Sequence, residues 1–143
     1  MAGDKPAACF TIHSLDHLRA ALTAAAASGL PVIALSAAGA SGFAGAGWFA
    51  GLVAQGRAEF PDAALIAILD CGDRGGDVVA ALKLGLPRLI FTGHPLAAQR
   101  LADIAAQSGA AIQTTRPPSC DLLNSRDPFY TARTHCEAFR KQP

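Results

Sequence analysis

An apolar run of six residues that ends abruptly in polar side chains restricts the fold more than any other feature. Ala64–Leu69 contains only apolar side chains, and Asp70, Cys71, Gly72 and Asp73 follow directly. A strand that is apolar on both faces is typical of a parallel sheet covered by helices. Ligands of such proteins bind at the carboxyl ends of the strands. We therefore predict an α/β protein with a candidate site that begins at Asp70.

The rest of the chain repeats an alternation of strand and helix. Ser14 and Pro95 are typical helix starts, Asp77 can cap a third helix, and glycines follow the apolar stripe of each. A further helix is expected around residues 48–58. About five parallel strands are predicted, at 8–12, 31–35, 64–69, 88–91 and 110–113.

The predicted organisation is a single α/β domain over 1–143. Residues 8–116 carry the βα repeats, and 117–143 form a covering segment whose one helix starts at Asp127-Pro128. Phe129, Ala132, Cys136 and Phe139 form its apolar stripe. Two architectures fit parallel strands joined by crossovers: half of a (β/α)8 (TIM) barrel, or an open flavodoxin-like or Rossmann-like sheet. A whole barrel takes about 250 residues.

Composition excludes several classes of function. The net charge is +1, and Lys and Arg form no long run, so nucleic-acid binding is not expected. Residues 20–56 carry no charge, but Pro31 and several glycines interrupt them, and we expect no membrane span. The first six residues lack the apolar core of a signal peptide, and the four cysteines show no CxxC spacing. These features predict a cytoplasmic protein with reduced thiols.

Four segments occur in an order that resembles a known family. Phe10–Leu18 comes first, then Leu30-Pro31-Val32-Ile33 with the later Gly39-Ala40 and Phe43-Ala44-Gly45, then Ile68–Asp73, and finally 80–93. Together they resemble the first half of the class II, metal-dependent fructose-bisphosphate aldolases, over residues 8–113. The resemblance implies half of a (β/α)8 barrel derived from a zinc-dependent lyase.

Carried over by position, the resemblance implies a depleted catalytic site. Asp70 falls on the proton-transfer aspartate of the family, whereas Cys71 replaces a metal-binding histidine. Gln113 is neutral where the family is acidic, and Ala37 stands where the family often has serine. The later strands of the family supply two further histidine ligands and the phosphate site, and this chain does not contain them. The expectation is a truncated aldolase-like protein without aldolase activity.

The strand ends supply the candidate site residues. Asp70 is a general base or ligand-orienting group, or alternatively hydrogen-bonds the loop amides. Cys71 and His94 follow neighbouring strands, so with one aspartate they could bind zinc, although no cofactor is the leading expectation. Candidate ligand-binding residues at the strand ends are Asp73, His13, Ser36, Thr92 and Gly93. The alternative is that isolated Cys and His residues are merely buried or solvated.

Gly45 and Gly47, followed by Asp70, imitate a dinucleotide fingerprint. The alternative is a flexible loop before a helix whose Trp48 and Phe49 pack on the sheet. His17 and His135 are expected at the surface.

Three functions remain open. The first is a binding or regulatory module for a small phosphorylated or carbonyl metabolite. The second is a metal-dependent lyase with Asp70 as base, and the third is a nucleotide-binding protein. Because half a barrel exposes strand edges, we expect a homodimer, or a sheet sealed by the C-terminal helix.

Overall fold

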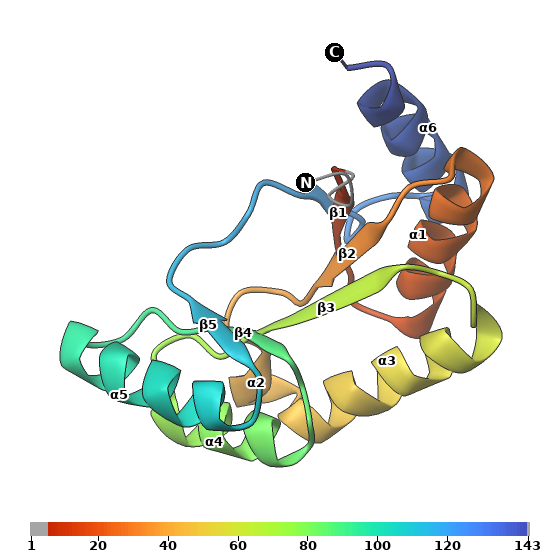
Figure 1. The fold of residues 1–143 in the computed structure, drawn as a ribbon. Helices are drawn as coiled ribbons and strands as arrows, with labels where there is room; N and C mark the ends of the chain where they lie inside the picture. The colour runs from red at the N-terminus through yellow and green to blue at the C-terminus, as the bar shows by residue number, and fades with distance from the viewer. Residues whose placement is uncertain (1–5, 143) are drawn as a thin grey trace. The chain divides into compact units, whose positions relative to one another are not determined.

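The computed structural model describes residues 6–142 and shows an α/β protein with six parallel strands flanked by helices (Figure 1). The strand order is β5-β4-β3-β2-β1-β6, so the first five strands follow one another in chain order. The sheet is open, and the chain reverses its direction across the sheet after β5, because the sixth strand pairs with β1. The predicted parallel strands are confirmed, and their bounds are β1 Ala8–Thr11, β2 Val32–Leu35, β3 Leu65–Asp70, β4 Arg88–Ile90 and β5 Ala111–Gln113.

The chain forms two compact units. Unit one contains the chain up to Leu35, Val53–Ile66 and the chain from Pro118 onward, and unit two contains Ser36–Leu52 and Ala67–Pro117. The strand β3 and the helix α3 (Ala46–Glu59) each contribute residues to both units. The single-domain organisation stays a prediction.

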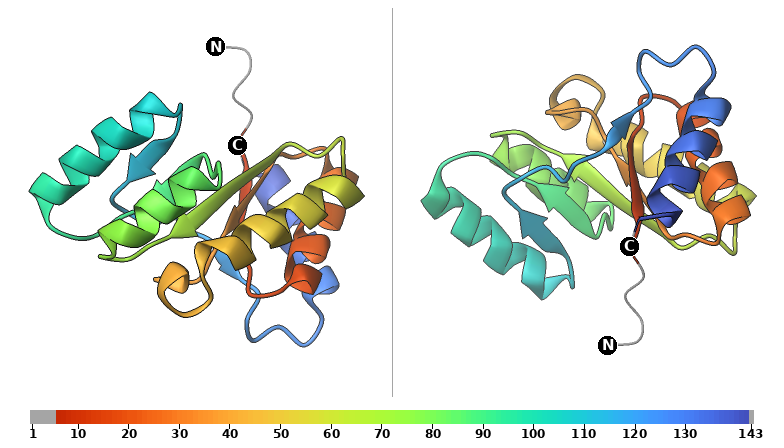
Figure 2. Two further views of the ribbon diagram at one scale, coloured as in Figure 1. Left: turned by 90° about the horizontal axis from the view of Figure 1, so that it is seen from below. Right: turned by 90° about the horizontal axis from the view of Figure 1, so that it is seen from above.

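Unit one is built on β1 and β2 with the helices α1 (Leu15–Ser28) and α6 (Pro128–Arg140). Ser14 caps α1, since its Oγ accepts a hydrogen bond from the His17 N–H at 3.1 Å. Gly29 ends α1 with a φ of 69°, which an L side chain rarely adopts. Asp127 caps α6 in the same way, and α1 and α6 lie side by side (Figure 2). Both helix starts are confirmed.

A sixth strand, β6 (Cys120–Asp121), was not expected from the sequence. It pairs in parallel with β1, with Phe10 opposite Cys120, and the Leu122 N–H donates to the Thr11 carbonyl oxygen at 3.1 Å. The Leu122 side chain is completely buried. The segment after 117 therefore contributes a strand as well as a helix. Two residues are too few to show the alternation by which a strand is predicted.

Unit two contains β4, β5 and the helices α2 (Ala40–Phe43), α4 (Gly75–Lys83) and α5 (Pro95–Gln107). The prediction that Asp77 caps α4 was wrong: Arg74 occupies the N-cap position, and Asp77 lies in the first turn. Its Oδ2 instead accepts a hydrogen bond from Ser41 Oγ at 2.8 Å. A tertiary partner thus takes the carboxylate that local sequence would assign to the helix end.

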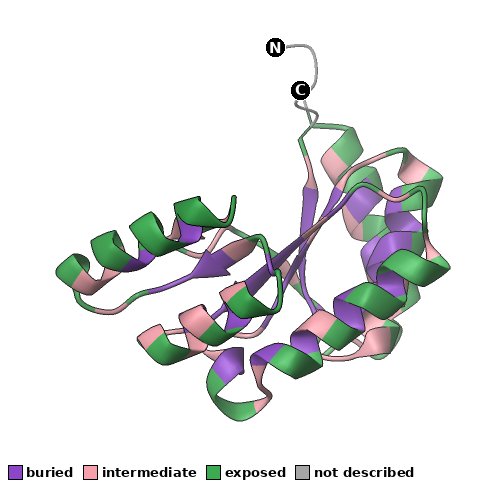
Figure 3. Ribbon diagram, turned by 60° about the horizontal axis from the view of Figure 1, so that its bottom comes forward, coloured by how far each residue is buried: buried purple, intermediate pink, exposed green. Residues whose placement is uncertain are grey.

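Most residues of β1 to β4 are buried, those of β5 and β6 are half-buried or exposed, and the outer faces of the helices are exposed (Figure 3). Completely buried side chains include Phe10, Leu18 and Leu22 in unit one and Leu69, Leu89 and Ile90 in unit two. In residues 6–142, no helix has the length and apolarity that a membrane crossing requires.

Candidate functional site

The Asp70 carboxylate, at the carboxyl end of β3, has hydrogen-bond partners on both oxygens. Its Oδ1 accepts from the Gly72 N–H at 2.8 Å, and its Oδ2 accepts from Arg116 Nη1, also at 2.8 Å. The Asp70 side chain is 4% exposed and the Arg116 side chain 29% exposed. The geometry matches the alternative in which Asp70 bonds the loop amides, because burying a carboxylate is costly unless it is paired.

Gly72 makes this arrangement possible. Its φ of 56° lies in the left-handed region, where an L side chain is strained. This conformation lets the loop fold back so that the Gly72 N–H meets the carboxylate two residues earlier. Gly72 also accepts at its carbonyl oxygen from the Thr92 N–H at 2.7 Å, so the loops after β3 and β4 are joined.

Arg116 was missed by the sequence analysis. It lies 46 residues after Asp70, in the segment that follows β5, and it belongs to the same unit. The available signal was indirect: an aspartate that ends an apolar strand needs a charged partner. Nothing local to Arg116 identified it as that partner.

Ser36 contributes to the same site from the end of β2. Its side chain is completely buried, and its Oγ accepts from the Asp70 backbone N–H at 2.9 Å. The hydroxyl donates in turn to the Ala37 carbonyl oxygen at 3.0 Å. Ser36 therefore fixes the backbone of Asp70, and its role as a ligand-binding residue stays a prediction.

Cys71 is completely buried beside Asp70. Burial raises the pKa of its thiol to about 11, and the nearby Asp77 and Asp70 carboxylates act in the same direction against a hydrogen bond with Ser41. Zinc binds the thiolate form of cysteine. The surroundings of Cys71 therefore favour the protonated thiol, which is a poor ligand.

The hydrogen bond of the His94 ring is made within its own helix start and does not involve Cys71. Its ring is exposed, and its Nδ1 accepts from the Leu96 N–H at 3.1 Å as the N-cap of α5. Within the part of the chain that the structure describes, no three His, Cys, Asp or Glu side chains are grouped as metal ligands. The zinc site of Cys71 and His94 stays a prediction.

Asp73, Thr92 and Gly93 belong to the loops at this same edge of unit two. Asp73 and Thr92 are exposed, whereas Gly93 is half-buried. A side chain at Gly93 would overlap the ring of Phe91, which is 2% exposed. Gly93 is thus required by packing, and the exposed Thr92 remains a candidate for contact with a ligand.

His13 belongs to unit one and pairs there with a residue that the sequence analysis did not single out. Its Nε2 lies 2.7 Å from Asp121 Oδ1, and its backbone N–H donates to His17 Nδ1 at 3.0 Å. Burial lowers the pKa of His17, and the adjacent His13 adds to this effect. A role of His13 in ligand binding stays a prediction.

Two histidines expected at the surface are half-buried. His17 contacts the His13 ring, and the His135 ring packs edge-on against Phe10 with 5.1 Å between centroids. Burial also lowers the pKa of His135. Local sequence does not show how far a neighbouring element covers either ring.

The Gly45 loop leads into α3, as expected, with Gly45 at a φ of 90°. Phe49 is completely buried, whereas Trp48 is 38% exposed. The packing alternative holds for Phe49 and only partly for Trp48.

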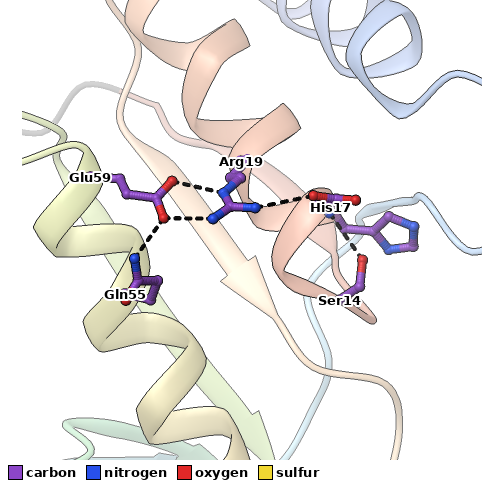
Figure 4. Close-up of polar contacts among 6 residues, drawn as sticks. Ser14, His17, Arg19, Gln55 and Glu59 are labelled. Carbon is purple, nitrogen blue, oxygen red and sulfur yellow. Dashed lines mark hydrogen bonds and ion pairs between the residues drawn. The ribbon is translucent and has the colours of Figure 1, made fainter.

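A second polar cluster, in unit one, joins α1 to α3 (Figure 4). Arg19 donates from Nε and Nη2 to the two carboxylate oxygens of Glu59, at 2.7 and 2.8 Å. Gln55 also donates to Glu59, and Arg19 donates to Asp16 at 3.3 Å. The bond from Arg19, followed by that from Gln55, lowers the pKa of Glu59 to about 2. The cluster holds two helices together, and both carboxylate oxygens of Glu59 are bonded within it.

A hollow of about 560 Å³ in unit one is lined by the end of α1, the residues before β2 and the loop 59–64. It lies at the amino ends of β2 and β3. Parallel-sheet proteins bind ligands at the opposite, carboxyl ends. The Asp70 site is therefore the stronger candidate.

Comparison with known proteins shows the fold. No family model and no curated protein matches the chain. A solved structure of a protein from Coccidioides immitis, provisionally assigned as a fructose-1,6-bisphosphate aldolase, is similar with a TM-score of 0.63 and 14% sequence identity. The match covers 76% of this chain and 45% of that chain, so the present chain spans less than half of its length. The fold is therefore aldolase-like.

Proposed function

We propose that this protein binds a small phosphorylated or carbonyl metabolite at the carboxyl edge of unit two and has no aldolase activity of its own. The observation that carries the proposal is the bonding of both Asp70 oxygens, to Gly72 and to Arg116. A general base needs an oxygen directed at the substrate. A carboxylate bonded in this way instead orients a guanidinium.

Arg116 is the group we assign to the ligand. Its side chain is 29% exposed although one of its nitrogens bonds a buried carboxylate. A guanidinium carries five N–H donors in a fixed plane and binds phosphate or carboxylate strongly. Asp70 would hold this plane in place, as an orienting partner does in many binding sites.

The neighbouring loops support an anionic ligand. The exposed Thr92 supplies a hydroxyl, and α5 begins three residues later, at Pro95. The amino end of a helix carries a partial positive charge that favours anions. A location in the cytoplasm remains part of the proposal.

Calorimetric titration with dihydroxyacetone phosphate, which carries both a phosphate and a carbonyl, tests the binding. We expect saturable binding that Arg116→Gln weakens about tenfold, equivalent to about 1.4 kcal/mol. The matched control is Arg100→Gln, which removes an exposed arginine of α5 and should leave binding unchanged. Arg116→Lys retains the charge and separates a loss of binding from a loss of Asp70 pairing. Absence of binding at millimolar ligand would contradict the proposal.

Retro-aldol cleavage of fructose 1,6-bisphosphate, with and without added zinc, tests the lyase alternative. We expect no turnover above the blank in either condition. A zinc-dependent turnover that disappears in Asp70→Asn would replace the proposal with a metal-dependent lyase. Titration with nicotinamide and adenine nucleotides tests the third function, for which we expect no binding.

A further inference from the structure

A face of unit one carries exposed aromatic rings beside a hollow. The hollow, of about 270 Å³, lies between α1 and α6 and is lined by Thr23, Ala24 and Ala27 on one side and by Asp127, Phe129, Tyr130 and Arg133 on the other. We call these seven residues the α1–α6 face. The small side chains come from α1 and the large ones from α6.

Both aromatic side chains of the face point outward. Phe129 is 46% exposed and Tyr130 58% exposed. The predicted apolar stripe of the helix is therefore wrong at Phe129, whereas Ala132 and Cys136 are buried and Phe139 is half-buried. Exposed aromatic rings grouped beside an apolar hollow are typical of interaction surfaces.

The face carries one acidic and one basic side chain. Asp127 precedes the two aromatic residues in the sequence, and Arg133 follows them. Asp127 caps the helix, and the Arg133 guanidinium lies over the Tyr130 ring at 5.5 Å from its centroid. In a two-fold dimer a residue i that contacts residue j is matched by a contact of j with i. If Arg133 of a second copy lies against Asp127, a two-fold axis therefore also places the Asp127 of that copy against Arg133.

We propose that the α1–α6 face is the interface of a homodimer, in which an aromatic ring of each copy enters the hollow of the other. The occupant is a second copy because the face supplies both halves of the contact: a ring and a hollow, an acid and a base. This dimer differs from the expected pairing of strand edges. The edge strands of the sheet are short, because β5 has three residues and β6 two. Such short edges are poor templates for pairing.

Sedimentation velocity over about 1 to 100 μM protein tests the dimer. We expect a concentration-dependent dimer whose dissociation constant rises about tenfold or more in Phe129→Ser. The matched control is Phe43→Ser, the same change at a ring that is 74% exposed on α2 in unit two, and it should leave the dimer intact. Circular dichroism melts establish that each variant is folded.

A charge exchange tests the two-fold geometry. Arg133→Glu and Asp127→Lys should each weaken self-association, because each sets two like charges opposite one another. An equimolar mixture of the two variants should dimerise again, since the introduced lysine then faces the introduced glutamate while the native aspartate and arginine pair. Arg140→Glu, at the far end of α6, is the charge control.

Three results would overturn the proposal. The native chain could remain a monomer at about 100 μM. The dimer could form equally well with Phe129→Ser and Phe43→Ser. The mixture of charge variants could stay monomeric although both variants fold.

Discussion

Asp70 is the residue on which the interpretation of the site depends, and its structural role can be measured separately from any activity. Asp70→Asn removes the charge that pairs with Arg116 and brings an amide group toward the Gly72 N–H. We expect the free energy of unfolding to fall by about 1–3 kcal/mol. This loss is smaller than that for a fully buried ion pair, because Arg116 is partly exposed.

Urea denaturation measures this loss, and Asp73→Asn is the matched control. Asp73 is exposed and lies three residues further along the same loop, so its variant should differ from the native chain by less than about 0.5 kcal/mol. Equal stability of the two variants would show that Asp70 does not anchor the loop.

We expect His135 to make the free energy of unfolding depend on pH. Burial lowers its pKa in the folded protein below the value of 6.5 that the imidazole has when exposed. Below that pH the unfolded chain takes up a proton that the folded chain resists, so the free energy of unfolding falls as the pH falls. His17, whose pKa is lowered by burial, acts in the same direction.

His135→Phe retains a ring against Phe10 and removes the titrating group. We expect the urea midpoint of the native chain to be lower at a pH about one unit below 6.5 than about one unit above it, and the difference to be smaller in the variant. A variant with the native pH dependence would assign the effect to other groups.

At the scale of the element, α3 contains three glycines, and a side chain would have opposite effects at two of them, Gly51 and Gly56. A methyl group at Gly56 would lie 2.6 Å from Leu18 Cδ2 and 3.2 Å from Leu22 Cδ1, whereas nothing lies within 4 Å of one at Gly51. Leu18 and Leu22 are completely buried and have little room to move. Gly51→Ala should raise the free energy of unfolding by about 0.5–1 kcal/mol, because alanine has the higher helix propensity.

Gly56→Ala gains the same propensity but overpacks the contact between α3 and α1. We expect a net destabilisation of about 1–2 kcal/mol. Thermal melts of the two variants, compared side by side, should shift in opposite directions. A stabilised Gly56→Ala would mean that the helices separate readily at this point.

The elements also show which parts of the fold the sequence could predict. The strand β3 was predictable because its first five residues are apolar, and α1 and α6 were predictable because Ser14 and Asp127 are strong caps. The strand β6 has two residues and no pattern of its own, since it is defined by pairing with β1. Local sequence specifies an element with internal periodicity, and tertiary contacts specify the others.

The same distinction applies to the site. Asp70 was predictable from its place at the end of an apolar strand. Its partner Arg116 was not, because the pairing depends on how the chain returns after β5. The predicted role of Asp77 as a helix cap was wrong for a similar reason, because its carboxylate bonds Ser41 instead. Long-range partners of charged groups are therefore the part that only the structure supplies.

At the scale of the whole molecule, the residues after the βα repeats belong to the core and are not merely a cover. Leu122, Ala132 and Cys136 are completely buried in unit one. In unit one β6 pairs with β1, and α6 packs against α1, so both elements after residue 117 take part in the packing of that unit.

Two adjacent leucines test this conclusion. Leu122 is completely buried, and Leu123 is 57% exposed. Leu122→Ala should cost about 2–4 kcal/mol of unfolding free energy, which is a large part of the total for a domain of this size. Leu123→Ala should cost less than about 0.5 kcal/mol. Urea denaturation of both variants provides the comparison, and a Leu122→Ala chain as stable as Leu123→Ala would mean that the C-terminal segment only covers a core formed without it.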